Sequence, residues 1–78
     1  MKDDKMINDT YRKLIYFFEN KIKVHFKDKD KIFYNGLIID LNEEKMTLVL
    51  QERMKGTIPI LLELIDTNSI SEFKEVGE

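Results

Sequence analysis

Residues 58–65 have the sequence Ile-Pro-Ile-Leu-Leu-Glu-Leu-Ile, a nearly continuous apolar segment within a chain of 78 residues. A strand of a small antiparallel barrel is normally apolar on its inward face and polar on the other. Taken as a strand, this segment carries Leu61 and Ile65 on the face opposite its other apolar side chains. Pro59 cannot donate to a ladder, which places the start of the strand at a sheet edge or an irregularity.

An edge strand that is apolar on both faces promotes aggregation if it stays open. The segment is therefore either a long strand buried beneath the N-terminal part of the chain or a strand that pairs with another copy of the chain. A chain this short buries only about 60–65% of its unfolded surface, which favours self-association. We expect the subunit interface to comprise seven apolar residues: Ile58, Ile60, Leu61, Leu62, Leu64, Ile65 and Ile70.

Three strands are predicted before this segment and one after it. Apolar and polar side chains alternate over residues 21–27, which is typical of a half-buried strand. Residues 31–41 form the second predicted strand, and Gly36 inside it marks a bulge, a bend or a close approach of two backbones. Residues 46–52 form the third, with Leu48 and Leu50 on one face, and residues 69–74 form a short last strand.

The N-terminal residues predict one amphipathic helix over about 4–19. Its apolar side chains recur at helical spacing, and Asn20 is a plausible stop. We expect this helix to lie across an open end of the barrel, where its apolar stripe covers the core. The stripe consists of Ile7, Tyr11, Leu14, Ile15 and Phe18.

The whole chain, residues 1–78, is expected to form a single, mainly β domain. An N-terminal helix precedes a small five-stranded antiparallel barrel over about 21–74. Strand number and length fit both the SH3-like and the OB-like classes.

Composition excludes several classes of function. The chain has 13 basic and 15 acidic residues, one His and no Cys. His25 has no nucleophile or second His to act with, so we expect neither an enzyme nor a metal or cofactor site, and no small-molecule substrate. The apolar runs are too short for a membrane span. The polar N-terminus and the lack of Cys favour a cytoplasmic protein.

One basic cluster lies in the first half of the chain, where residues 1–31 carry nine basic and six acidic groups. A positive ridge of this kind could follow a phosphate backbone, or it could simply be a solvated surface. Phe33 or Tyr34 could stack a base beside it, although barrel core is the expected role of both. The ridge consists of Lys21, Lys23, His25, Lys27, Lys29 and Lys31.

The chain resembles the Sm/LSm family over residues 10–75. Three segments resemble the first Sm motif: Val24-His-Phe-Lys-Asp28, Gly36-Leu-Ile-Ile39 and Met46-Thr-Leu-Val-Leu50. One segment resembles the second Sm motif: Ile65-Asp-Thr-Asn-Ser-Ile70. The resemblance implies a strongly bent five-stranded, SH3-like barrel. It also implies a hexameric or heptameric ring, in which the fourth strand of one subunit pairs with the fifth strand of the next. Residues 36–50 also resemble the middle of an archaeal ribonuclease P subunit with an Sm-like barrel.

The family binds RNA through an Asp and an Asn around one loop and through an Arg-Gly pair after the fourth strand. This chain has Asn42, Thr47 and Asp66-Thr67 at those places. Asp66 is an acceptor-only anion in place of a five-donor cation. The resemblance and the ridge together predict an RNA site formed by Asn42, Lys45, Thr47, Lys21, Lys23 and Lys27.

Two functions follow from these observations. The first is a ring-forming, RNA-associated, Sm-like module that assembles as a homo-oligomer through its fourth and fifth strands. The alternative is a structural or protein-interaction module of the same small fold, which would use the apolar fourth-strand edge to hold a partner or further copies of itself. Steep salt dependence of RNA binding distinguishes the first from the second.

Overall fold

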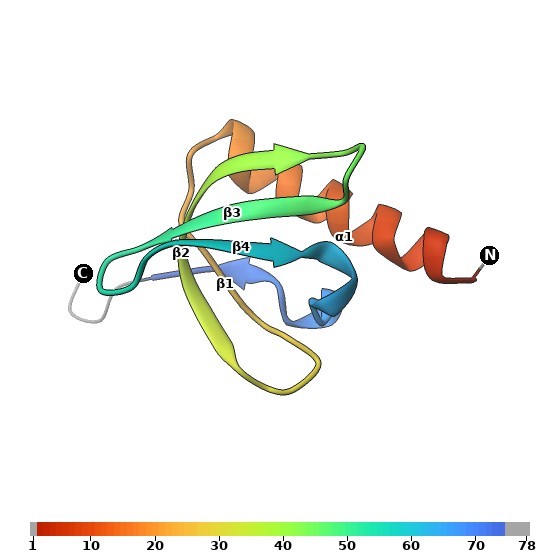
Figure 1. The fold of residues 1–78 in the computed structure, drawn as a ribbon. Coiled ribbons are helices and arrows are strands. Elements are labelled where there is room, and N and C mark those ends of the chain that lie inside the picture. Colours follow the sequence, from red (N-terminus) through yellow and green to blue (C-terminus); the bar gives the residue numbers. More distant parts are fainter. Residues whose placement is uncertain (1, 75–78) are drawn as a thin grey trace.

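Helix α1 (Lys2–Glu19) precedes a five-stranded sheet in the computed structural model (Figure 1). The structure describes residues 2–74, with side chains from residue 8 onward, so the Ile7 side chain lies outside the described part. Leu14 is fully buried, and Tyr11 and Phe18 pack against the core, as the helical spacing predicts. Helix α1 packs against the sheet and the two turns that follow β4. No helix among residues 2–74 has both the length and the apolar character needed to cross a bilayer.

The end of α1 is fixed by its own backbone. The N–H of Ile22 donates to the carbonyl oxygen of Phe17 at 3.0 Å, and that of Lys21 donates to Phe18 at 3.4 Å. Lys21 has a φ of 54°, the left-handed conformation that completes this type of C-terminal cap. The Asn20 side chain adds a bond to the carbonyl oxygen of Tyr16 at 2.8 Å. The predicted stop at Asn20 is confirmed.

All strands of the sheet pair antiparallel, in the order β4-β3-β2-β1-β5. This confirms a mainly β chain with one helix and five strands. The strands alternate buried and exposed side chains, so Val24, Phe26, Leu48 and Leu50 face inward as their spacing predicts. The strand bounds are β1 Val24–Lys27, β2 Phe33–Asn42, β3 Thr47–Glu52, β4 Gly56–Leu61 and β5 Ser71–Glu72.

Strand β2 belongs to both halves of the sheet. Its first residues pair with β1 up to Gly36, and its later residues pair with β3 from Leu37 onward. A side chain on Gly36 would overlap the backbone carbonyl of Gln51. The predicted close approach at Gly36 is therefore present, and a register shift between Ile38 and Asp40 adds a bulge to the same strand.

The prediction of one continuous strand over 58–65 is wrong. Strand β4 ends at Leu61, and Leu62–Leu64 forms a 3-10 turn, η1. Three residues per turn bring Leu62 and Ile65 to the same side, where both are buried. Leu61 and Leu64 are left 46% and 48% exposed. The turn therefore explains why apolar side chains occurred on both faces of the expected strand.

The predicted barrel is not closed. Strands β4 and β5 are the two edges of the sheet, and they do not pair with each other among residues 2–74. A second 3-10 turn, η2 (Thr67–Ser69), follows η1, and β5 adds only two residues to the edge of β1. The segment between β4 and β5 instead bonds to the β1–β2 hairpin, from Lys29 N to Leu64 O at 2.9 Å and from Asp66 N to Lys27 O at 3.0 Å.

The core lies between α1, the inner face of the sheet and the segment after β4. Its members come from every strand except β5, so the helix and the segment after β4 cover the sheet together. The buried apolar residues are Leu14, Val24, Phe26, Ile38, Leu48, Leu50, Ile60, Leu62 and Ile65.

Candidate nucleic-acid interface

The outward face of β1 carries the basic side chains that the sequence singled out. Val24 and Phe26 point into the core, so His25 and Lys27 occupy the opposite face by strand alternation, and Lys23 directly precedes the strand. Lys23 is exposed, whereas His25 and Lys27 are half-buried. Lys21 lies apart from them in the cap of α1. The structure therefore keeps His25 and Lys27 of the predicted ridge on one strand face, with Lys23 next to them in the chain.

An aromatic pair lies on this same face. The rings of His25 and Phe33 are stacked, with centroids 5.5 Å apart and planes 13° from parallel. His25 Nδ1 shares a hydrogen bond with Asn35 Oδ1, and these two residues are register partners in the β1–β2 ladder. Phe33 is 58% exposed although it is a large apolar side chain. The pair is held by two strands and open to solvent.

Phe33 and Tyr34 have different roles, and the sequence did not separate them. Tyr34 packs against the core, with its ring 5.5 Å from that of Phe26. Phe33 faces outward, so the expectation of a core role is wrong for Phe33. Alternation with the buried Gly36 and Ile38 was the signal that could have placed it. The Asn35 contact could not be seen in sequence, because it depends on the register of β1 against β2.

The carboxylate of Asp28 accepts hydrogen bonds from the hairpin turn. Its Oδ1 accepts from the backbone N–H of Asp30 at 2.9 Å and of Ile32 at 3.0 Å, and its Oδ2 accepts from the Tyr34 hydroxyl at 3.3 Å. Burial, followed by the neighbouring Asp28 charge, raises the pKa of Tyr34 above its ordinary value of 10.0. Asp28 thus shapes the turn that presents the lysines.

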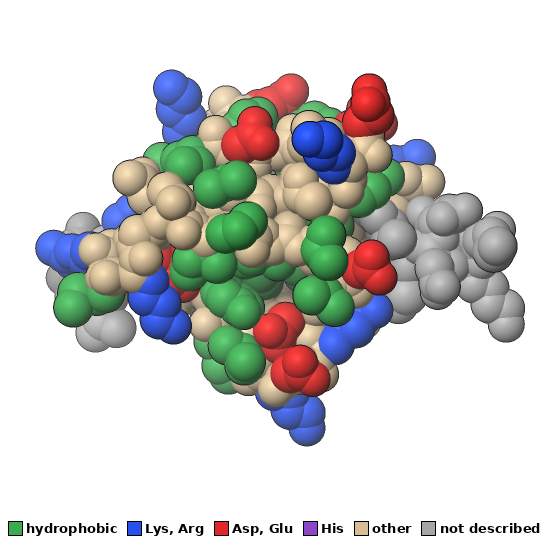
Figure 2. Space-filling model, in the orientation of Figure 1, with side chains coloured by type: hydrophobic (Ala, Val, Ile, Leu, Met, Phe, Trp, Pro, Cys, Tyr) green, Lys and Arg blue, Asp and Glu red, His purple; other side chains and the backbone are tan. Residues whose placement is uncertain are grey.

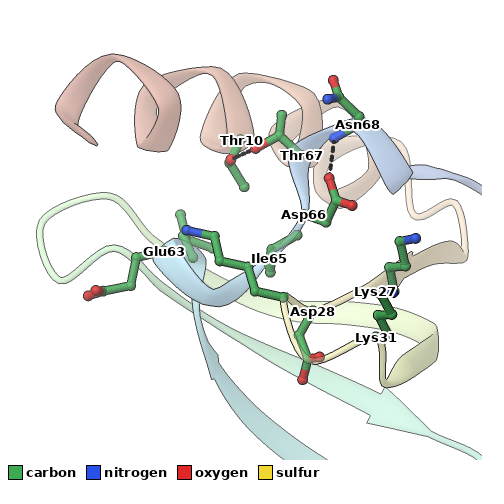
Figure 3. A pocket seen from close by; sticks show the side chains of 11 residues that line it. Thr10, Lys27, Asp28, Lys31, Glu63, Ile65, Asp66, Thr67 and Asn68 are labelled. Atoms are coloured by element: carbon green, nitrogen blue, oxygen red, sulfur yellow. Dashed lines mark hydrogen bonds between the residues drawn. The ribbon is translucent and has the colours of Figure 1, made fainter. Parts of the chain in front are cut away.

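An open pocket of about 360 Å³ lies between this hairpin and residues 62–68 (Figure 3). The three lysines at positions 27, 29 and 31 line it, together with acidic side chains that include Glu63 and Asp66. Asp66 Oδ1 accepts from the N–H of Asn68 at 3.1 Å and caps η2. The charges around this pocket are mixed, so the pocket by itself is not selective for an anion.

The helix reaches this pocket through Thr10. Its buried hydroxyl shares a hydrogen bond with the hydroxyl of Thr67, as Figure 3 shows. Lys13 Nζ also donates to the carbonyl oxygen of Thr67 at 3.3 Å. The Asp66-Thr67 pair therefore caps η2 and holds the helix against this turn.

The other predicted RNA-binding residues form a second group at the β2–β3 turn. Asn42 pairs with Thr47 in the ladder, and Asn42 Oδ1 accepts from the backbone N–H of Lys45 at 2.8 Å. This turn lies at the opposite end of β2 from Phe33. The structure thus brings Asn42, Lys45 and Thr47 together, but it places them apart from the β1 face.

The predicted interface residues divide by burial. Ile60, Leu62 and Ile65 belong to the core, and Ile58 and Ile70 are partly buried against it. Leu61 and Leu64 remain exposed next to the β4 edge. Figure 2 shows hydrophobic side chains gathered near the centre of the face that carries β3 and β4, with charged side chains around them.

No protein-family model, no curated protein and no solved structure matches this chain. Within the described part of the chain, there is also no group of three His, Cys, Asp or Glu side chains that could hold a metal ion. The function is therefore inferred from the sheet edges and the basic face.

Proposed function

We propose that this chain is a subunit of a ring-forming, Sm-like assembly that binds single-stranded RNA. The observation that carries the proposal is the open strand order β4-β3-β2-β1-β5, which leaves an unpaired edge at each end of the sheet among residues 2–74. Two different edges of one molecule can pair head to tail, and such contacts form a ring when the rotation between subunits closes. Pairing of β4 with β5 of the next copy would cover both edges.

The backbone of β4 offers hydrogen bonds to a partner. The N–H of Leu62 donates to the carbonyl oxygen of Met46 at 3.0 Å, which directs that residue's N–H toward β3. Backbone groups alternate sides along an antiparallel strand, so the N–H and C=O of Leu61 and the C=O of Pro59 face the free side. The exposed Leu61 and Leu64 side chains add apolar area beside this edge.

RNA binding is supported by the charges and the aromatic pair on β1 and β2. Lys23 and Lys27 flank His25 in the chain, and lysines at 29 and 31 continue the positive charge around the hairpin. A groove or ridge of lysines with exposed aromatic rings is typical of proteins that bind single strands. Asn42, Lys45 and Thr47 would contribute a second contact from the β2–β3 turn.

Filter binding with oligo(U), measured at several salt concentrations, tests the RNA part of the proposal. Release of counterions from several lysines should make retention fall steeply between about 50 and 200 mM salt. A structured RNA of equal length should be retained less well, because its bases are not open for stacking. Absence of retention of either RNA at the lowest salt would overturn RNA binding.

A protein-interaction module of the same fold is the second candidate. The exposed Leu61 and Leu64 favour it, since an open strand edge with apolar neighbours can accept a strand from a different protein. The two candidates differ in RNA binding: the first requires that oligo(U) is retained with a steep salt dependence, whereas the second requires that no RNA is retained.

A further inference from the structure

We propose that Phe33 and His25 form a base-stacking platform, on which one base of single-stranded RNA lies against the outer face of β1 and β2. This inference rests on the proposed RNA-binding function and assigns it a site. The stacked pair has an open side, because Phe33 is 58% exposed while its ring is already aligned with His25. A base placed on Phe33 would extend the stack by one ring.

The platform is preorganised by the ladder. Phe33 is the register partner of Lys27, and Asn35 is the register partner of His25. The hydrogen bond between His25 and the Asn35 side chain orients the imidazole, and the backbone N–H of Asn35 donates to Glu52 Oε2 at 3.4 Å. Rings that are fixed before binding lose little conformational entropy when a base stacks on them.

Positive charge lies on both sides of the platform. Lys27 adjoins Phe33 on one side, where it also lines the pocket beside the hairpin. Lys23 lies on the other side of His25, where it lines an open depression together with Asn35 and Arg53. Lys23 and Lys27 are four residues apart, which is about 13 Å along a strand. A nucleic-acid backbone could therefore contact both lysines while one base lies between them.

Two acidic side chains near this path, Glu52 and Asp28, accept hydrogen bonds from the surrounding residues. Glu52 accepts from the backbone N–H of Asn35, and Asp28 accepts from its own turn and from Tyr34. Their carboxylates remain charged neighbours, so the platform derives its affinity from stacking as well as from the lysines. A nucleic-acid backbone without bases would lose the contribution of stacking to the affinity.

The chain contains no Trp, so the variant Phe33→Trp provides a single fluorescent reporter at the platform. The tryptophan emission should be quenched when oligo(U) binds. The variant should bind oligo(U) at least as tightly as the parent chain does. Phe33→Ala should weaken binding about 5- to 150-fold, the range for the loss of one stacked base. Because Phe33 is exposed, both variants should keep the circular dichroism spectrum of the parent chain.

Tyr16 provides a matched control, since it is 57% exposed but lies on α1 with its ring edge-on to Phe17. Tyr16→Ala should bind as the parent does, and Tyr16→Trp should not be quenched. The platform is wrong if Phe33→Ala binds RNA like the parent and the emission of Phe33→Trp is not quenched. If retention of oligo(U) by the parent still falls with salt in that case, RNA binding itself stands. If the parent retains no RNA at low salt, the proposed function fails with it.

Discussion

Gly36 of β2 lies so close to Gln51 of β3 that a Cβ atom at Gly36 would overlap the Gln51 carbonyl oxygen. At this point β2 passes from pairing with β1 to pairing with β3. The approach of two backbones therefore makes the turn of the sheet possible, and no larger residue fits.

Gly36→Ala should lower the free energy of unfolding by about 1–3 kcal/mol, the usual cost of inserting a methyl group into a close-packed site. Urea denaturation followed by circular dichroism measures the change. Gly56 is the control, because it has a φ of 78° and no atoms within 4 Å of its added Cβ. Gly56→Ala should cost about 1–2 kcal/mol from the left-handed backbone alone. An unchanged stability of Gly36→Ala would contradict the close approach.

The Thr10–Thr67 hydrogen bond should stabilise the docking of α1. Thr10 is only 2% exposed, so Thr10→Val keeps its shape and removes a buried hydroxyl from the contact with Thr67. Loss of one partner of a buried hydrogen bond costs about 1–3 kcal/mol. Thermal unfolding of this variant checks the value, and Thr57→Val, at an exposed position of β4, should remain within about 0.5 kcal/mol of the parent.

Tyr34 should make the fold sensitive to alkaline pH. Burial and the Asp28 charge raise its pKa in the folded chain above 10.0, so the unfolded chain loses this proton first. Its contribution to stability is therefore complete below pH 10 and is lost as pH rises through the folded-state pKa. Stability measured against pH should fall less steeply above pH 10 in Tyr34→Phe than in the parent. Identical profiles would argue against the raised pKa.

Lys27 should contribute to RNA binding through its charge. Lys27→Ala should weaken retention of oligo(U) and reduce the slope of log affinity against log salt by about 0.7, the value for one phosphate contact on a single strand. Lys55 in the β3–β4 turn is exposed and lies outside the proposed path, so Lys55→Ala should leave the slope unchanged. Equal slopes for the parent and both variants would show that Lys27 makes no phosphate contact.

Local periodicity was sufficient to predict the helix and most of the strands. Leu14, Val24 and Phe26 are buried where their spacing placed them, because one face of each element must pack on the core. The break at Leu62 could not be predicted in this way, since a 3-10 turn inside an apolar segment leaves the composition unchanged. The open barrel could not be predicted from local periodicity either, because it depends on how residues 62–69 fold back on the β1–β2 hairpin.

The candidate site was predicted in part. Lys27 shares a face with His25 because a strand alternates, and this needs no tertiary information. By contrast, the stacking of Phe33 on His25 depends on the β1–β2 register, and the contact of Thr67 with Thr10 depends on the path of the chain after β4. Those relationships are set by packing between segments that are distant in sequence.

Leu61→Pro should break the assembly without breaking the fold. Leu61 has a φ of −79°, which proline can adopt, and its N–H faces the free side of β4. Loss of that donor weakens each subunit contact by about 1 kcal/mol, or roughly fivefold, and the effect is repeated at every contact of a ring. Leu61→Ala keeps the N–H and should dissociate less. Unchanged assembly of a folded Leu61→Pro chain would show that this edge is not paired.

The mass of the unaltered chain under native conditions tests the central claim most directly. One chain has a mass of 9.3 kDa. Native mass spectrometry and light scattering at micromolar concentration should both give a single hexameric or heptameric species if, as we propose, β4 and β5 of successive copies pair around a closed ring. A monomer of 9.3 kDa in both measurements would contradict the account.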